Sequence, residues 1–467
     1  MIMKKTAITC FIGMGLALGG CGEGDGSGDA STGADGVPTS ADGTTGADGN
    51  EDNSTTNSTT NSTTPGDGDG DTGDGDGDPG DGDGDPTTTG ENNPKWDLGT
   101  VPDSAFNCGQ GGGNGSDPDF SFLWAANSTQ GTISKIDTKT VTEVGRYIVR
   151  PDSNGSPSRT SVSLSGHVAV ANRSGGVTKI YAREDYCEDT NGMPGIQTSN
   201  SNQFLAWGQE ECVAWHTPMN YQSQRPVAWG AGTFNEGSCV WDDEELWTSG
   251  TNNNGTIDVY VLDGEDGSTK EMVAIPTGGN GLTASFYGIY GGAVDGNGDF
   301  WGSQLGSSGR LVRVNRDDMS YDIWDTPNNG SWYGMTVDSE GYVWLCSSTV
   351  ARFDPADETF QTASVGGYTG CMADAAEDGL LWMSTGGQGV VGVNRDTLMV
   401  EKMWNAGGSY GVSIDFEGYV WTVAYGTTAS KIDPETGQFW TYNGLVGAYT
   451  YSDMTGYALS NVGTPSG

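Results

Sequence analysis

The sequence predicts an all-β fold, a seven-bladed β-propeller of four-stranded blades whose ring is closed by a C-terminal strand. The first reason is a repeat: YGMTVDSEGYVW at 333–344 recurs as YGVSIDFEGYVW at 410–421 and as YGGAVDGNGDFW at 290–301. In each copy Tyr stands 11 residues, Asp 6 residues and Gly 3 residues before a Trp. The second reason is that no stretch of the chain has the 3.6-residue periodicity of an amphipathic helix.

Each repeat unit is predicted to contain four short strands joined by tight turns. Around Trp344 the strands MTVD and YVWL are followed by ARFD, and other units add a fourth strand such as FWTY at 439–442. A four-stranded sheet repeated about every 40 residues cannot bury both of its faces alone, whereas sheets stacked radially can. Seven units are present, and their key positions are Trp124, Val170, Trp247, Trp301, Trp344, Trp382 and Trp421.

Two units depart from this pattern. The spacing of 77 residues from Val170 to Trp247 predicts an insertion at about 183–229. The first unit lacks an inner strand, and AYTYSDMTGYAL at 448–459 is left over after the seventh unit. We expect this segment to supply the missing strand and close the ring, because closure removes exposed sheet edges.

The first 20 residues are predicted to be a lipoprotein signal peptide, with two lysines followed by an apolar run from Ala7 to Leu18. The run ends in Leu-Gly-Gly-Cys, which resembles a bacterial lipobox. That resemblance implies lipidation of Cys21 and a membrane anchor at the bacterial cell envelope. Gly22 in place of Asp favours the outer membrane or the cell surface. The alternative is a soluble secreted protein.

Residues 21–95 are predicted to be the lipidated Cys followed by a disordered acidic linker. Within 22–94 there are 18 Asp and Glu, no Lys or Arg, and almost no apolar residue to offset the entropy cost of folding. The propeller domain then occupies 96–467. The net charge of the chain, −42, repels nucleic acid, so we expect no nucleic-acid partner. We also expect a monomer.

The repeat resembles the streptogramin B lyase (virginiamycin B lyase) family and its NHL-like relatives over about 118–460. In these lyases a His precedes the Gly of certain blades and acts as a base, and a Glu three residues after a blade Trp helps to hold magnesium. The positions that match the His are Tyr290, Tyr333, Tyr410 and either Thr369 or Cys371; those that match the Glu are Gln304, Ser347, Thr385 and Ala424. The resemblance therefore implies the fold but not the lyase residues, and no catalytic residue is predicted.

The tyrosines that replace the His are the main candidates for ligand binding. Tyr290, Tyr333 and Tyr410 begin inner strands and should meet at the central channel, where they either plug it or stack on a ligand. The insertion adds Trp207 and Trp215, which either pack on the propeller or form a binding lip. The two histidines, His167 and His216, are expected in a turn and in the insertion, and the acidic cluster Asp242, Asp243, Glu244 and Glu245 is expected at a solvated corner.

Eight cysteines are present. Cys10 leaves with the signal peptide and Cys21 is lipidated, so six remain for three disulfides, with 15 possible pairings. The arrangement that we favour pairs Cys187 with Cys212, Cys346 with Cys371, and Cys108 with Cys239. No cofactor is predicted. Asp189 and Asn191 in CEDTNG offer a calcium interpretation beside that of an ordinary turn.

These observations predict a surface-tethered binding module for a protein or a polysaccharide, which binds on the central face near the inserted segment. Two alternatives remain open. One is an enzyme, either lyase-like or a hydrolase that uses carboxylates. The other is a purely architectural envelope protein.

Overall fold

The computed structural model describes residues 121–235, 240–327, 330–376 and 379–462. The predicted signal peptide and linker lie outside the described residues, as do Cys21, Cys108 and Cys239. Among the described residues, no helix combines the length and the apolar character that crossing a membrane requires.

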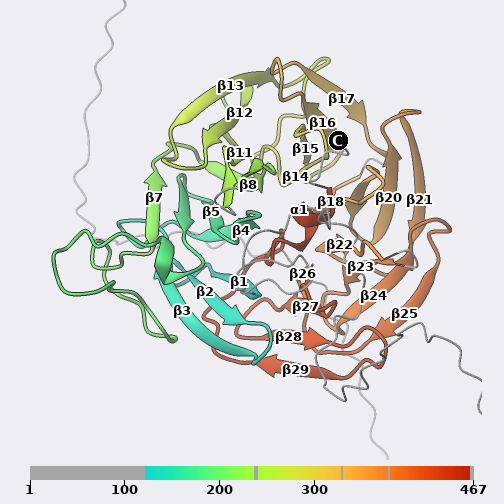
Figure 1. Ribbon diagram of the computed structural model, residues 1–467. Coiled ribbons are helices and arrows are strands. Elements are labelled where there is room, and N and C mark those ends of the chain that lie inside the picture. The colour runs from blue at the N-terminus through green and yellow to red at the C-terminus, as the bar shows by residue number, and fades with distance from the viewer. Residues whose placement is uncertain (1–120, 236–239, 328–329, 377–378, 463–467) are drawn as a thin grey trace, which may run out of the picture. The chain divides into compact units, whose positions relative to one another are not determined.

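The predicted seven-bladed β-propeller is confirmed, and the blades follow one another around a ring in chain order (Figure 1). Blade one contains β1 (Phe122–Asn127), β2 (Thr132–Asp137) and β3 (Thr142–Ile148); blade two contains β4 (Pro157–Val162), β5 (Val168–Asn172), β6 (Val177–Ile180) and β7 (Val213–Thr217). Blade three contains β8 (Ser223–Trp229), β11 (Glu245–Thr251), β12 (Thr256–Asp263) and β13 (Thr269–Pro276), with the small hairpin of β9 (Thr233–Asn235) and β10 (Val240–Asp242) inserted after β8.

The remaining four blades are four-stranded antiparallel sheets. Blade four contains β14 (Gly291–Val294), β15 (Phe300–Ser303), β16 (Arg310–Val314) and β17 (Tyr321–Asp325); blade five contains β18 (Gly334–Val337), β19 (Val343–Cys346), β20 (Thr349–Asp354) and β21 (Thr359–Ser364). Blade six contains β22 (Cys371–Ala373), β23 (Leu380–Ser384), β24 (Val390–Asn394) and β25 (Val400–Trp404); blade seven contains β26 (Gly411–Ile414), β27 (Val420–Val423), β28 (Ala429–Ile432) and β29 (Phe439–Tyr442). The first strand of each blade from two to six contacts the first strand of the next, so these strands surround the central channel.

The repeated sequence is a hairpin that satisfies its own polar groups. In blade five the Trp344 indole N–H donates to Asp338 Oδ2 over 2.8 Å, while Asp338 Oδ1 accepts the backbone N–H groups of Glu340 and Tyr342. The same indole bond joins Trp301 to Asp295 and Trp421 to Asp415. The Asp closes the turn and at the same time lets the indole be buried without an unpaired donor.

The buried Trp rings hold neighbouring blades together. Trp344 packs with Leu381 and Met383 of blade six, and Trp421 packs with Leu123 and Ala125 of blade one. The core is therefore a ring of interfaces between blades, which explains why a single blade could not fold alone.

The C-terminal segment closes the ring. The Tyr449 N–H donates to the Ala126 carbonyl over 3.0 Å, and the Trp124 N–H donates to the Met454 carbonyl over 2.8 Å. Residues 448–454 thus run along the inner edge of β1 as the innermost member of blade one. The predicted strand was drawn to residue 459, but Gly456 takes φ 92° and the chain then forms helix α1 (Tyr457–Val462).

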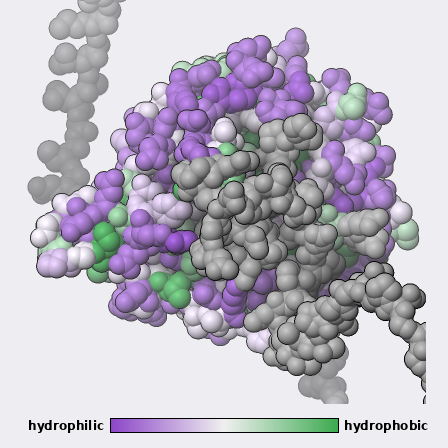
Figure 2. All heavy atoms as spheres, viewed as in Figure 1, coloured by the Kyte–Doolittle hydropathy of each residue, from purple (hydrophilic) through white to green (hydrophobic). Residues whose placement is uncertain are grey.

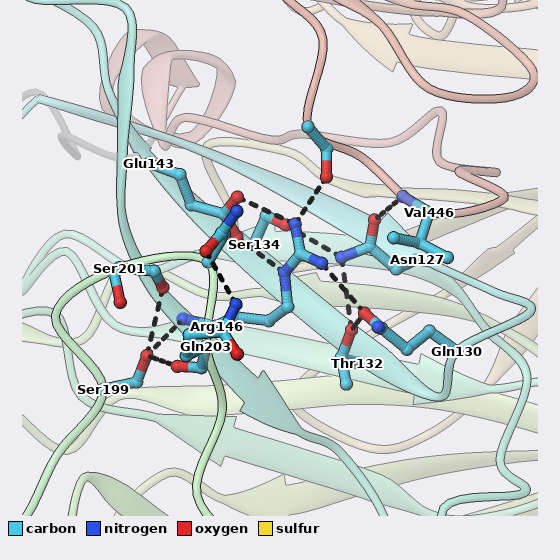
Figure 3. A network of polar contacts seen from close by, with 12 residues as sticks. Asn127, Gln130, Thr132, Ser134, Glu143, Arg146, Ser199, Ser201, Gln203 and Val446 are labelled. Carbon is cyan, nitrogen blue, oxygen red and sulfur yellow. Dashed lines mark hydrogen bonds and ion pairs between the residues drawn. The ribbon is translucent and has the colours of Figure 1, made fainter.

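A buried polar network joins blade one to the segment after blade seven and to the inserted segment of blade two (Figure 3). Arg146 on β3 makes a bidentate ion pair with Glu143, at 2.8 Å for each bond, and its guanidinium also donates to the Gly444 carbonyl after β29. The Arg146 backbone N–H donates to Ser199 Oγ in the inserted segment over 2.9 Å. The Asn127 carboxamide oxygen accepts the Val446 N–H over 2.8 Å. Breaking this network would leave buried charges unpaired. The network therefore stabilises the contact between blade one and the segment after blade seven, and we call it the polar joint.

The inserted segment lies at 181–212, between β6 and β7, and projects from the outer rim of the ring (Figure 1). The predicted range of 183–229 extends too far, because 213–217 form the outermost strand of blade two and 223–229 form the innermost strand of blade three. The described surface on the side seen in Figure 2 is largely hydrophilic, including most of the rim.

Candidate functional site

Five tyrosines meet at one end of the central channel, and we call them the tyrosine cluster. Tyr290, Tyr333 and Tyr410 come directly before β14, β18 and β26, so the repeat itself brings them to the same end. Tyr449 and Tyr451 come from the closing segment and pack against them. Sequence reasoning missed these last two, although the alternation in AYTY placed both on one face of the predicted strand.

The tyrosine cluster plugs this end of the channel. The Tyr290 and Tyr449 hydroxyls are hydrogen-bonded over 2.8 Å, those of Tyr333 and Tyr410 over 3.1 Å, and the Tyr333 hydroxyl also bonds that of Tyr449. Tyr290, Tyr449 and Tyr451 are buried. Burial raises the pKa of Tyr290, Tyr333 and Tyr449 well above the usual range and that of Tyr410 to about 12, so these phenols are neutral.

Four further aromatic side chains surround this plug, and we call them the aromatic rim: Phe286, Tyr287, Tyr368 and Tyr425. Ring contacts lead from Phe286 through Tyr287 to Tyr290, at 5.5 Å for each step. The rings of Tyr368 and Tyr425 lie 5.7 Å and 6.0 Å from that of Tyr410.

The rim is far more exposed than the plug. Phe286 is 57% exposed, Tyr368 47% and Tyr425 73%. A continuous set of rings therefore leads from the buried centre to solvent.

Three arginines face the tyrosine cluster. The Arg159 guanidinium, on β4, lies 3.5 Å from the centre of the Tyr451 ring, and that of Arg225, on β8, lies 4.8 Å from the Tyr290 and Tyr287 rings. The Arg173 guanidinium lies 4.9 Å from the Tyr449 ring. Arg159 and Arg225 are only 1% and 7% exposed, whereas Arg173 is partly exposed.

These three arginines differ from every other arginine of the chain in their partners. Eight of the eleven have a carboxylate oxygen of a described residue within 4 Å: Arg146, Arg150, Arg183, Arg310, Arg313, Arg316, Arg352 and Arg395. Arg159, Arg173 and Arg225 have none among the described residues, and bond instead to neutral oxygens such as the Tyr451 and Tyr333 carbonyls and Ser223 Oγ. A cation–π interaction with a ring face stabilises a guanidinium by about 0.5–2 kcal/mol. Removing the same ion from water costs several kcal/mol, so the rings offset only part of this cost. Positive charge is thus concentrated at this end without a matching carboxylate in the part of the chain that the structure describes.

The uncompensated charge acts on the one tyrosine that lies closest to it. Burial raises the pKa of the Tyr451 phenol, but the guanidinium groups of Arg159 and Arg225 outweigh burial and bring this pKa below its usual range. The pKa of Tyr451 is therefore shifted downwards, whereas the pKa values of the other four phenols of the cluster are shifted upwards.

The opposite end of the channel is closed by α1. A cavity of about 40 Å³ remains between α1 and the inner strands, lined by Val227, Met335, Asp453 and Leu459 among others. That volume suits a few water molecules rather than a ligand. The Tyr457 hydroxyl of α1 donates to Asp374 Oδ1 over 2.9 Å and fixes the helix.

The predicted tryptophans lie elsewhere. Trp215 is on β7, the outermost strand of blade two, and its indole N–H donates to the Gly264 carbonyl over 3.1 Å. Trp207 lies in the inserted segment with its ring 5.7 Å from that of His216. Both therefore sit at the outer rim of the propeller. We expected the inserted segment and the central channel to form one site, and in the structure they are separate.

The histidines do not converge. His167 is buried against Tyr181 and Tyr186, and burial lowers its pKa well below the usual range. His216 is on β7, not in the insertion, and its Nδ1 is 2.9 Å from Thr178 Oγ1.

The acidic cluster at 242–245 is only partly the solvated corner that we expected. Glu244 is buried and accepts the Ser165 N–H, and burial raises its pKa. Glu245 pairs with Lys270 at 2.7 Å and with Arg316. These carboxylates are structural partners within and between blades.

The calcium candidates accept bonds from their own loop. Asp189 Oδ1 accepts the Gly192 N–H over 3.2 Å, and Asn191 Oδ1 accepts the Met193 N–H over 2.8 Å. Such bonds are typical of Asx turns. No group of three or more metal-binding side chains is found among the described residues.

Two of the predicted disulfides are present. Cys187–Cys212 closes the inserted segment, and Cys346–Cys371 joins β19 of blade five to β22 of blade six.

These features define the class as a closed seven-bladed β-propeller with an aromatic, arginine-bearing end. No protein-family model matches the chain, and no curated protein matches it. Similar solved structures include a functionally unknown protein from Desulfotomaculum acetoxidans (13% identity, TM-score 0.47, covering 71% of this chain and 99% of that one). They also include BamB from Moraxella catarrhalis (14%, 0.42, 72% and 86%) and virginiamycin B lyase from Staphylococcus aureus (13%, 0.40, 61% and 83%). Similarity this low carries no information on activity or ligand.

Proposed function

We propose that this protein is a binding module tethered to the bacterial envelope, and that a protein or a polysaccharide docks at the tyrosine end of the channel. The aromatic rim carries this proposal. A plug needs only the buried cluster, yet Phe286, Tyr368 and Tyr425 extend the ring contacts into solvent. Aromatic groups of this kind supply large, rigid contact area at binding surfaces. An architectural role would need the plug but not the exposed rings.

The test compares two sets of exposed aromatic residues. The rim variant is Phe286→Ser/Tyr368→Ser/Tyr425→Ser. The matched control is Phe439→Ser/Trp440→Ser, which removes two exposed rings, 46% and 39% exposed, from β29 at the outside of blade seven. The immobilised full chains are exposed to envelope extract and to purified envelope polysaccharides, and retained material is identified by mass spectrometry and sugar analysis.

We expect the native chain and the control to retain the same ligand. The rim variant should retain at least tenfold less of it. Equal retention by all three folded proteins would move the site away from the rim. No retention by any of them would leave the architectural role as the better account.

The tether is part of the same proposal and rests on the sequence alone. Lipidation of Cys21 would hold the propeller at the outer membrane or cell surface, separated from it by the acidic linker. The expected result is that the native chain sediments with membranes and that Cys21→Ser releases it. A native chain that stays soluble would show that the chain is secreted without an anchor.

The lyase or hydrolase alternative has less support. Neither histidine nor the acidic cluster at 242–245 lies at the tyrosine end, and general acid–base chemistry needs such groups within hydrogen-bond reach of the substrate.

A further inference from the structure

We propose that the tyrosine end contains a subsite for a carboxylate group carried on a ring. The ring stacks on the aromatic rim, and the carboxylate is held by the guanidinium groups that face the tyrosine cluster. This inference rests on the proposed function and adds the chemistry of the ligand.

The arrangement connects the exposed rings to the charges. Arg225 lies 4.8 Å from the ring of Tyr287, a rim residue, as well as from that of Tyr290. On the other side, Arg173 lies 4.9 Å from the Tyr449 ring, which is itself 5.8 Å from the exposed ring of Tyr425. A ligand ring stacked on Tyr287 would therefore lie near Arg225, and one on Tyr425 would be separated from Arg173 by the Tyr449 ring.

The charge balance indicates an anion. Every other arginine of the chain has a described carboxylate within 4 Å, although acidic residues outnumber basic ones 62 to 20. The three exceptions all face one cluster. The buried Nε of Arg159 also has no hydrogen-bond partner among the described residues. An arrangement that leaves buried donors and charge unmatched is costly unless a bound group completes it.

The chemistry favours a carboxylate over a more highly charged group. A guanidinium presents parallel N–H donors whose geometry matches the two oxygens of a carboxylate. Residues 95–467 contain 44 acidic and 18 basic residues, a net charge of 18 − 44 = −26. That field opposes dianions and polyanions more strongly than a single negative charge. A ring-bound monocarboxylate fits both the rings and the field.

The experiment measures binding of benzoate, D-glucuronate and neutral benzamide to the full chain by isothermal titration calorimetry at low and high salt. Benzoate and glucuronate present the carboxylate on an aromatic ring and on a sugar ring, so their relative affinities distinguish the two ligand sources. We expect at least one of them to bind at least tenfold more tightly than benzamide, and to weaken as salt increases.

Three arginine variants locate the subsite. Arg225→Met and Arg173→Ala should each weaken carboxylate binding at least tenfold, and Arg310→Ala, which removes an arginine paired with Asp325, should leave it unchanged. Arg173 is partly exposed, so its variant keeps the test valid if Arg225→Met does not fold. Without ligand, Arg225→Met should melt no lower than the native chain, because it removes a buried charge that has no carboxylate partner among the described residues.

Two results would overturn the subsite. One is equal binding, or no binding, of benzoate, glucuronate and benzamide. The other is absorbance near 295 nm at pH 7 that disappears in Tyr451→Phe, since a Tyr451 phenolate would then balance the arginines internally. If rim-dependent retention of an envelope ligand persists in either case, the proposed function stands and only the carboxylate subsite fails.

Discussion

At the scale of single residues, one bond explains the repeated sequence. Asp295, Asp338 and Asp415 each accept the indole N–H of the Trp six residues later, at 2.7–2.8 Å. Blade six shows what happens when the spacing changes. Asp374 stands eight residues before Trp382, and its carboxylate accepts the hydroxyl of Tyr457 from α1 instead. The Asp is thus retained where a second donor replaces the Trp.

Asp415 should make stability depend on pH. Burial raises its pKa to about 7, although Lys431 Nζ lies 3.5 Å away. The unfolded value is about 3.9, so between about pH 4 and pH 7 the folded state holds a proton that the unfolded state has lost, and stability falls as pH rises. Relative to Asp415→Asn, the native free energy of unfolding should fall by up to about 1.4 kcal/mol per pH unit in that range and level off above it.

Urea unfolding of both proteins at pH 5, 6, 7 and 8 measures this difference. A difference that stays constant from pH 5 to pH 8 would mean that the Asp415 carboxyl titrates at or below its ordinary pKa in the folded protein.

At the scale of elements, the sequence predicted the features that recur in each repeat unit. Blade positions, the Trp hairpins and two disulfides followed from spacing, because each hairpin carries its own turn, its own buried ring and its own polar partner. The end of the insertion did not follow. VAWHT at 213–217 pairs with β6 as the outermost strand of its blade, but its Trp215 is not preceded by an Asp and a Gly at the spacing that marks other units. The short helix α1 gave no periodic signal, since six residues make fewer than two turns.

In the candidate site, only the residues that belong to the repeat could be predicted from the sequence. Tyr290, Tyr333 and Tyr410 belong to the repeat, so their convergence could be expected. The arginines could not be found this way, because their contacts join distant parts of the chain. Arg159 bonds the Tyr451 carbonyl across 292 residues of sequence, and no local pattern encodes that pairing. Trp215 was assigned to the insertion although it lies on β7, because an insertion without a repeat gives no indication of where it ends.

At the scale of the whole molecule, stability depends on closure. Every blade interface buries apolar side chains of two neighbouring sheets, and the interface between blades seven and one also contains Ala448 and Met454 of the closing segment. The closing segment also supplies Tyr449 and Tyr451 to the cluster. The fold and the proposed site are therefore completed by the same residues, and losing them should affect both.

Two deletions separate the contributions of the closing segment and of α1. Removing 447–467 takes away the bonds from residues 448–454 to β1 and leaves the inner edge of blade one exposed, while removing 456–467 takes away α1 alone. We expect the longer deletion to lower the melting temperature by more than about 10 °C, since a loss of several kcal/mol shifts a large domain by a few degrees per kcal/mol. It should also promote association, because an open sheet edge pairs with other chains. The shorter deletion should lower the melting temperature less and leave the chain monomeric.

Circular dichroism melting and size-exclusion chromatography measure both effects. If the two deletions melt together and neither associates, closure depends on α1 and the polar joint at Arg146 rather than on the segment that runs along β1.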